Sequence, residues 1–365
     1  STGTSMGACA SFLYNLRQGI FDIQAGRSRI AIVGNAEAPI TPEVMEGYAA
    51  MGALASDKAL RELDGLGADV EPDYRRACRP FADNCGFTIA ESAQMVVLMD
   101  DELALETGSS IYGSVSDVFV NADGHKKSIS APGVGNYITV AKALAAARSI
   151  VGEEAVRRGG LVQAHGTGTP QNRVTESHIL NEVAKTFGIQ QWPVGAVKAY
   201  LGHSIGSAAA DQLVTTLGSW QHGLLPGIAT IDDLAEDVHH SNLDISASHR
   251  QLDLQEQRYA IINAKGFGGN NASANILSPM QTRTMMEKRH GATMWKQWQR
   301  ANEQVCERSH AYEESAQAGE AKPVYRFDHN VLGDADVALR SDRLELAGGQ
   351  VSVDLQFENP YADMS

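Results

Sequence analysis

Short apolar runs rich in β-branched residues alternate along most of this chain with longer stretches whose apolar residues recur at helical spacing. Residues 29–34 are one such run, and we expect them to form a strand that is buried on both faces. Further strands are expected near residues 94–99, 110–120, 160–164, 193–197, 258–264 and 271–277, with helices near 42–54, 136–157, 174–187 and 206–222. This order indicates a layered α/β domain.

The sequence changes in character after Leu277, where it becomes rich in Met, Gln, Glu, Lys and Arg. One stripe of a helix is predicted there by four residues at helical spacing: Met294, Trp298, Ala301 and Val305. Alternating apolar residues on either side of Gly348-Gly349 predict a two-stranded hairpin. The apolar face of that hairpin packs either on its own domain or on another subunit or partner.

Charge and cysteine content exclude several classes of protein. The chain has 30 Lys and Arg against 44 Asp and Glu, a net charge of −14, which argues against nucleic acid or an anionic membrane surface as the main partner. No apolar run approaches the length needed to span a bilayer. The four cysteines have no regular spacing, so they predict neither a metal site nor a disulfide framework, and a cytoplasmic location is expected.

Three reactive side chains, Cys9, His165 and His203, each stand among small residues, which favours an exposed reactive group over a packed core. Apolar residues at helical spacing follow Cys9, so this thiol is expected at a helix N-terminus, where the dipole lowers its pKa. His165 ends an apolar strand and precedes a glycine-interrupted loop, a common position for a group that faces a ligand. Taken alone, Cys9 is more often an inert buried cysteine. One thiol with two imidazoles suggests thioester chemistry.

Five motifs, in chain order, resemble those of the β-ketoacyl-ACP synthases, the decarboxylating condensing enzymes of fatty acid and polyketide synthesis. They are Ala8-Cys9-Ala10-Ser11; Arg79-Pro80-Phe81 with Gly86-Phe87 and Glu91; residues 164–170 with Glu176; Val197-Lys198 with Gly202-His203; and residues 266–272. The resemblance implies a thiolase-type, duplicated α/β fold of α-β-α-β-α layers. It divides the chain into residues 1–135, the remainder of an N-terminal half with the nucleophile; 136–277, a C-terminal half with both histidines; and 278–365, a helical and β-hairpin extension.

The same resemblance assigns roles to the three reactive side chains. Cys9 is implied to attack an acyl thioester and to carry the acyl group as an acyl-enzyme. His165 and His203, both neutral, are implied to stabilise the enolate that forms when a malonyl thioester loses CO2. The resulting carbanion then attacks the acyl group on Cys9.

Further residues of the resembling motifs have supporting roles. Lys198 and Glu176 are implied to pair and to order the site. The backbone N–H groups of Cys9 and Phe267 are implied to form the oxyanion hole, with Phe267 also a gate. Thr167 and Thr169 are implied to bind the phosphopantetheine arm.

The resemblance implies no bound cofactor and no metal, because acyl groups arrive on the phosphopantetheine arm of acyl carrier protein (ACP) or of CoA. The expected partners are ACP, acyl-CoA or acyl-ACP, malonyl-ACP and a second copy of the chain in a homodimer. Since ACP is acidic, it would dock on a basic cluster such as Arg75-Arg76, Lys126-Lys127 or Arg157-Arg158. Taken alone, each cluster is more often only a solvated surface pair.

Some features depart from the family pattern. Asn172-Arg173 stand where Gly-Asp is usual, and Lys265 stands where an aromatic residue is common, which leaves the acyl preference open. Only eight residues precede Cys9, so we expect part of the N-terminal half to be missing from this sequence. The charged stretch after Leu277 resembles that of the FabY-type bacterial synthases, a subgroup that starts fatty acid synthesis from acetyl-CoA and malonyl-ACP.

The same residues are compatible with alternative functions. A polyketide-type ketosynthase would use the same trio. A non-catalytic partner subunit of a synthase heterodimer would typically lack the nucleophile, which this chain retains at Cys9. A thiolase would want a second cysteine late in the core, and Cys306 lies beyond it.

Overall fold

The computed structural model describes residues 3–126, 133–322, 324, 326–329 and 331–364. Contacts divide the chain into two compact units, Ser1–Cys306 and Glu307–Ser365, and each is described by itself. In the described part of the chain, no helix is both long and apolar enough to cross a membrane. The first unit holds every residue to which the sequence assigns a catalytic role.

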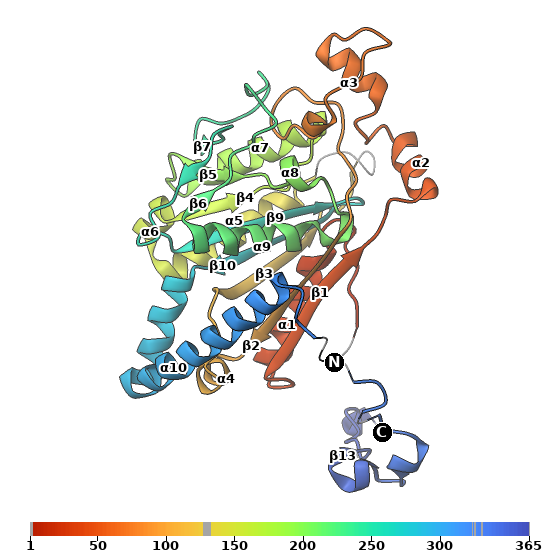
Figure 1. Ribbon diagram of the computed structural model, residues 1–365, viewed down its shortest axis with the longest axis vertical. Coiled ribbons are helices and arrows are strands. Elements are labelled where there is room, and N and C mark those ends of the chain that lie inside the picture. The colour runs from red at the N-terminus through yellow and green to blue at the C-terminus, as the bar shows by residue number, and fades with distance from the viewer. Residues whose placement is uncertain (1–2, 127–132, 323, 325, 330, 365) are drawn as a thin grey trace. The chain divides into compact units, whose positions relative to one another are not determined.

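A six-stranded sheet with strand order β3-β10-β9-β4-β5-β7 forms the centre of the first unit (Figure 1). Its strands are β3 (Ser114–Ala122), β4 (Gly160–Gln163), β5 (Trp192–Gly195), β7 (Leu243–Asp244), β9 (Tyr259–Gly266) and β10 (Asn270–Leu277). β3, β10 and β9 run antiparallel, whereas β9, β4, β5 and β7 run parallel. In β9 successive side chains enter different cores, Ile261 on one side and Ile262 on the other, so this strand is buried on both faces.

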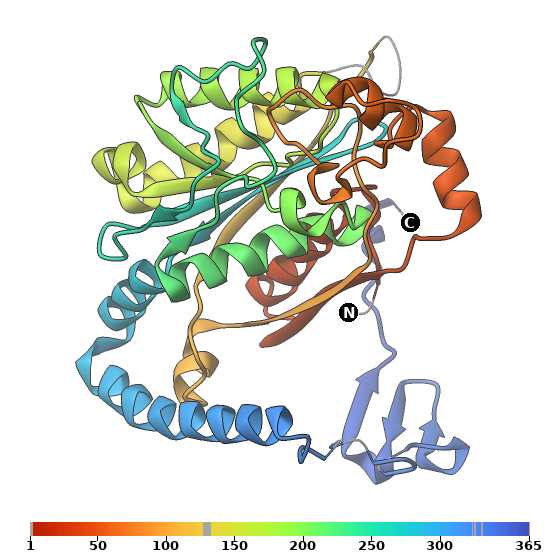
Figure 2. The same ribbon diagram turned by 45° about the horizontal axis from the view of Figure 1, so that its top comes forward.

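Helices cover both faces of the six-stranded sheet. α5 (Gly135–Val151) and α7 (Pro170–Thr186) pack on one face, and α1 (Ser11–Gln24) and α9 (Ala208–His222) pack on the other. A second sheet, β1 (Ile30–Glu37) paired with β2 (Ser92–Met99), lies against α1 and α9 on the side away from the six strands (Figure 2). The described elements therefore build four layers, α-β-α-β, of the five that the family resemblance implies.

The expectation that residues 29–34 form a strand buried on both faces is wrong in its second part. The strand exists as β1, and Val33 on one face is buried against α1. Ile32 on the opposite face is 72% exposed. Among the described residues β1 pairs with β2 alone, and no helix covers this second face, so the apolar run is exposed there.

The predicted helices are confirmed with shifted boundaries. The stretch 136–157 is two helices, α5 and α6 (Glu153–Arg158), because Gly152 between them has a φ of 88°, which a helix does not allow. Shorter elements that the sequence did not predict complete the unit: α3 (Asp57–Asp64), α4 (Asp101–Glu106), α8 (Lys198–Leu201), β6 (Leu224–Leu225) and β8 (Arg250–Gln251). The predicted helix near 42–54 is α2 (Pro42–Ala50).

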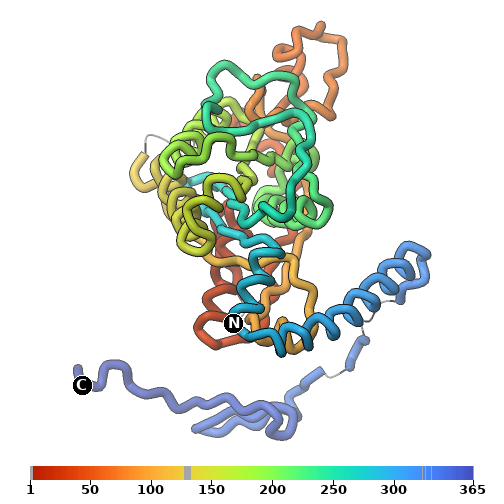
Figure 3. Tube along the Cα trace, turned by 90° about the vertical axis from the view of Figure 1, so that its left-hand side faces the viewer, coloured from red at the N-terminus to blue at the C-terminus, as the bar shows by residue number. Residues whose placement is uncertain are grey.

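The predicted C-terminal helix is α10 (Pro279–Gln317), which bends where Gly291 leaves the helical conformation (Figure 3). Trp295 and Trp298 stack and are buried against Leu105 and Ile111 of the first unit. The first part of the predicted extension, up to Cys306, thus belongs to the main compact unit. The expected division of the chain at residues 135 and 277 stays a prediction.

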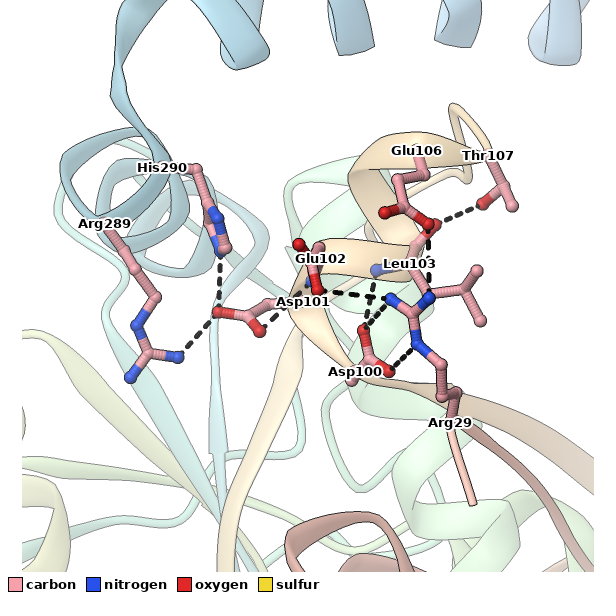
Figure 4. A network of polar contacts seen from close by, with 9 residues as sticks. All are labelled: Arg29, Asp100, Asp101, Glu102, Leu103, Glu106, Thr107, Arg289 and His290. Carbon is pink, nitrogen blue, oxygen red and sulfur yellow. Dashed lines mark hydrogen bonds and ion pairs between the residues drawn. The ribbon is translucent and has the colours of Figure 1, made fainter. Parts of the chain in front are cut away.

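Ion pairs join α4 to its neighbours in the same region (Figure 4). Asp101 accepts hydrogen bonds from Arg289 at 2.6 Å and from His290 at 2.9 Å, both on α10. Arg29, just before β1, pairs with Asp100 at 2.7 Å. These contacts are partly exposed, so they orient α4 more than they stabilise it.

The second unit contains the predicted hairpin, β12 (Arg343–Leu346) and β13 (Val351–Asp354), which pair antiparallel. A third strand, β11 (Val337–Leu339), adds to β12 and was not predicted. Val337, Leu346 and Val351 stand opposite one another in the register, so one face of this small sheet is apolar.

Candidate active site

Cys9 lies at the N-terminus of α1, separated from its first residue by the N-cap Ala10, as the sequence predicts. The chain reaches it through a tight turn in which Ala8 has a φ of 50°, a strained value for a residue with a side chain. Ser11 stabilises this turn, because its hydroxyl donates to the Ala8 carbonyl at 2.6 Å and accepts from the Gly7 N–H at 3.0 Å. The thiol is thereby held in a fixed direction at the helix N-terminus.

The expectation that the helix N-terminus lowers the pKa of Cys9 is wrong. Burial raises the pKa of the thiol to about 11, although Lys198 and the backbone N–H groups of Phe267 and Cys9 favour the thiolate. Cys9 is 2% exposed, and the loss of hydration at such a position outweighs the dipole. Cys9 is therefore a thiol at neutral pH, and its sulfur lies next to the two N–H groups expected in the oxyanion hole.

His165 follows β4 and His203 follows α8, and their rings meet edge to face with centroids 5.3 Å apart. Both residues are buried, at 4% and 1% exposure, so the expectation of exposed reactive groups is wrong for the histidines as well. Backbone hydrogen bonds fix His203 beside an extended segment, since its N–H donates to the Thr88 carbonyl at 2.7 Å.

Burial, reinforced by the Lys198 ammonium, holds the pKa of both imidazoles well below the usual range. The two rings are neutral at physiological pH. Nδ1 of each ring is buried and lacks a hydrogen-bond partner among the described residues. A neutral imidazole that carries its proton on Nε2 can donate one hydrogen bond toward a ligand.

Glu176 is fully buried and accepts four hydrogen bonds. One carboxylate oxygen accepts from the His165 N–H at 2.7 Å, and the other from the Gly166 N–H at 2.8 Å. The helix expected near residues 174–187 would have placed Glu176 in its first turn, but α7 begins at Pro170. Glu176 therefore fixes the backbone on which His165 is carried, and the helix dipole does not explain its presence.

Lys198 opens α8 and is 2% exposed. Its ammonium donates to the His165 carbonyl at 2.6 Å. Burial lowers the pKa of Lys198, whereas the charge of Glu176 raises it. Within the described residues the two side chains form no direct ion pair; they bind the N–H and the carbonyl of the same residue, His165.

One cavity of about 810 Å³ brings most of the predicted residues together. Six of them line it: Cys9, His165, His203, Phe267, Thr167 and Thr169. The hydroxyls of Thr167 and Thr169 are 3.1 Å apart just before α7, and both residues line the cavity. Lys198 and Glu176 are not in the lining and lie behind His165.

Several residues around the cavity were missed by sequence reasoning. Tyr48 packs against Phe87 and Phe267, two aromatic residues of the cavity lining, with ring centroids 5.4 and 6.0 Å apart. Asn263 is fully buried in β9 and donates to Glu176 at 2.7 Å. A polar side chain in the middle of an apolar strand is a signal that could have identified Asn263.

Arg173, one of the departures from the family pattern, points away from the cavity. It pairs with Asp237 at 2.8 Å and with Asp83 at 3.3 Å, and so ties α7 to two loops. The departure at Arg173 is therefore structural. Lys265 and Asn172, by contrast, both line the cavity.

In this layered fold a buried cysteine at a helix N-terminus therefore shares one cavity with two histidines. The β-ketoacyl synthase N-terminal domain matches residues 2–104, and the β-ketoacyl synthase C-terminal domain matches residues 112–232. The chain belongs to the β-ketoacyl synthase family and has its thiolase-like fold.

Over its whole length the chain is 50% identical to the β-ketoacyl-[acyl-carrier-protein] synthase FabY of Pseudomonas aeruginosa, of which it covers 57%. The crystal structure of that FabY ketosynthase superposes with a TM-score of 0.92 and is covered to 56%. Across 73% of the chain the 3-oxoacyl-[acyl-carrier-protein] synthase 2 of Vibrio cholerae is 29% identical and is covered to 59%. The ishigamide ketosynthase/chain length factor superposes over 76% of the chain with a TM-score of 0.60 and 26% identity, and is covered to 61%.

The chain thus spans 57% to 59% of the length of these curated relatives. The predicted family and fold are confirmed. The similarity to FabY over the full chain also agrees with the subgroup indicated by the charged stretch after Leu277.

Proposed function

We propose that this chain supplies the catalytic residues of a β-ketoacyl-ACP synthase, which condenses an acyl thioester with malonyl-ACP to give 3-ketoacyl-ACP, CO2 and free CoA or ACP. The observation that carries the proposal is the shared cavity of Cys9, His165 and His203. The pathway is fatty acid biosynthesis, and similarity to FabY favours its initiation from acetyl-CoA.

In the first half-reaction the sulfur of Cys9 attacks the carbonyl carbon of the acyl thioester. The new bond joins Cys9 to the acyl group, and the C–S bond to CoA breaks. The proton of the Cys9 thiol leaves with the CoA thiol, which matches a nucleophile that is protonated at rest. The N–H groups of Cys9 and Phe267 bind the oxyanion of the intermediate, worth about 3 kcal/mol for each donor.

In the second half-reaction His165 and His203 each donate an N–H to the thioester oxygen of the malonyl group. The bond to the carboxylate breaks, CO2 leaves, and the electron pair becomes an enolate whose charge the two donors stabilise. Its carbon then attacks the acyl carbonyl on Cys9, a C–C bond forms, and the C–S bond to Cys9 breaks. Cys9 departs as the thiolate and takes up one proton from bulk water. Neutral rings suit this step because a neutral imidazole donates a hydrogen bond without having to be protonated.

Glu176 and Lys198 take no part in bond changes under this proposal. They hold the N–H and carbonyl of His165, and so keep its ring aimed at the cavity. Thr167 and Thr169 would bind the phosphopantetheine arm.

The proposal includes acidic ACP as carrier, a homodimer and a cytoplasmic location. Some of the basic side chains that could dock ACP form ion pairs within the chain. Arg76 pairs with Asp232, and Arg157 and Arg158 pair with acidic residues one helical turn earlier on α6. Lys127 lies outside the described residues. Charge reversal at the docking cluster should raise the KM for ACP, and an unchanged KM at all three clusters would refute basic-cluster docking.

The test is the separation of acylation from decarboxylation in the full-length protein. His203→Ala should abolish CO2 release from malonyl-ACP while Cys9 still accepts an acetyl group. The matched control is His222→Ala, an exposed histidine on α9, which should change neither. Retained decarboxylation in His203→Ala would refute the assigned role, and a panel of acyl-CoA and acyl-ACP primers distinguishes fatty acid initiation from elongation and from a polyketide role.

A further inference from the structure

Two departures from the family pattern, 93 residues apart in sequence, are in direct contact in the cavity wall. The ammonium of Lys265, near the end of β9, donates to the side-chain oxygen of Asn172 at 2.8 Å and to the Thr175 hydroxyl at 3.1 Å. Lys265 is half-buried and lines the cavity with Asn172. Its contacts therefore link the substrate cavity to the first two turns of α7.

The amide nitrogen of Asn172 contacts Glu176, the buried carboxylate behind His165. Its amide nitrogen donates to Glu176 at 2.9 Å, on the carboxylate oxygen that also accepts from the Gly166 N–H. An ammonium has no acceptor and a carboxylate has no donor, so only one orientation of the Asn172 amide satisfies both neighbours. Lys265 thus selects the orientation in which Asn172 holds Glu176.

We propose, on the basis of the function proposed above, that Lys265 is a positioning residue: it orients Asn172, which anchors the Glu176 carboxylate that fixes the backbone of His165 and Gly166. We call this chain of contacts, from Lys265 through Asn172 and Glu176 to His165, the relay. It connects the cavity wall to one of the two histidines proposed to bind the enolate. It makes decarboxylation, rather than acylation of Cys9, sensitive to Lys265.

The charge of Lys265 acts on the same histidine. Charged and titratable groups surround His165 from several elements. They are Lys198 on α8, Lys265 on β9, Glu176 on α7, and His203 after α8. Burial is the main cause of the lowered pKa of His165, and Lys198, His203 and Lys265 act in the same direction. Removing the Lys265 cation raises the pKa of His165, so His165 becomes protonated at a higher pH and the acid limb of decarboxylation moves upward.

Four variants of the full-length protein separate position from charge. Lys265→Met and Asn172→Ala should each slow malonyl decarboxylation about tenfold, the effect of one lost buried hydrogen bond. Because they interrupt one relay, the double variant should be no slower than the slower single variant. The acid limb should move in every variant that lacks the Lys265 cation and stay in place in Asn172→Ala alone. Lys142→Met, on the outer helix α5, is the matched control and should leave rate and pH profile unchanged.

Lys265→Gln provides a second route if the methionine variant does not fold, as judged by acetylation of Cys9. It retains a donor toward Asn172 without the charge, so it should keep the rate at neutral pH and still move the acid limb. Additive losses in the double variant, or a higher KM for malonyl-ACP with an unmoved acid limb, would overturn the proposal, because Lys265 would then contact substrate directly. A wild-type protein that releases no CO2 would instead refute the proposed function.

Discussion

Replacing Glu176 with Gln exchanges one oxygen for an amide nitrogen, yet it disturbs a side chain that accepts four buried hydrogen bonds. Each carboxylate oxygen accepts from one backbone N–H and from one Asn side chain. The N–H groups of His165 and Gly166 belong to the backbone and cannot turn away. Whichever way the new amide turns, its NH2 group faces a buried backbone N–H that has lost its acceptor.

The expected cost follows from that geometry. A buried donor without a partner costs about 1 to 3 kcal/mol, and a bond to a charged acceptor is at the stronger end, so Glu176→Gln should lower the free energy of unfolding by about 2 to 4 kcal/mol. Domains of ordinary stability have about 5 to 15 kcal/mol in total. The variant should fold, with reduced stability and with His165 displaced.

Urea unfolding of the full-length protein measures this change, with Glu182→Gln on the same helix as the matched control. The control should differ from wild type by less than about 0.5 kcal/mol, as is usual for substitutions away from buried contacts. Decarboxylation should fall more than acetylation of Cys9, because Glu176 holds His165. A Glu176→Gln protein with the wild-type midpoint and rate of CO2 release would refute the reasoning.

Three further predictions address other parts of the structure. Alkylation of Cys9, followed on its own peptide by mass spectrometry, should rise with pH toward a midpoint near 11, and a plateau in the ordinary thiol range would contradict the burial effect. Gly266→Ala places a methyl group against the Gly7 carbonyl and should slow acetylation of Cys9 at least about 100-fold, the scale of a lost oxyanion donor; an unchanged rate would show that this turn can move. Trp298→Ala should cost about 3 to 5 kcal/mol in urea unfolding, whereas Trp298→Phe, which mainly loses the bond to the Ser109 carbonyl, should cost about 1 kcal/mol; equal losses would contradict the packing role.

Sequence patterns predicted the burial of a strand well where both of its faces lie in a core. β9 reads as an apolar run because both of its faces are in a core. β1 has the same composition, yet one of its faces is exposed, and a run of apolar letters carries no information about what covers it. Boundaries failed where a local feature decided them, as at Gly152, whose positive φ separates α5 from α6.

The site was predictable as a set of residues but not as a network. Motifs identified Cys9, His165 and His203 because small neighbours mark them, and the cavity contains all three. The pKa of Cys9 could not be predicted, since it depends on burial by elements far along the chain. The contact of Lys265 with Asn172 was equally out of reach, because each is only an unusual residue in its own motif.

The most direct test of the central claim is the mass of the Cys9 peptide after the full-length protein is incubated with labelled acetyl-CoA in the absence of malonyl-ACP. We expect the mass of one acetyl group on that peptide, its loss when malonyl-ACP is added, and no label on the same peptide in Cys9→Ala. An absent adduct, or a label on Cys78 or Cys85 instead, would contradict the assignment of Cys9 as the acyl carrier.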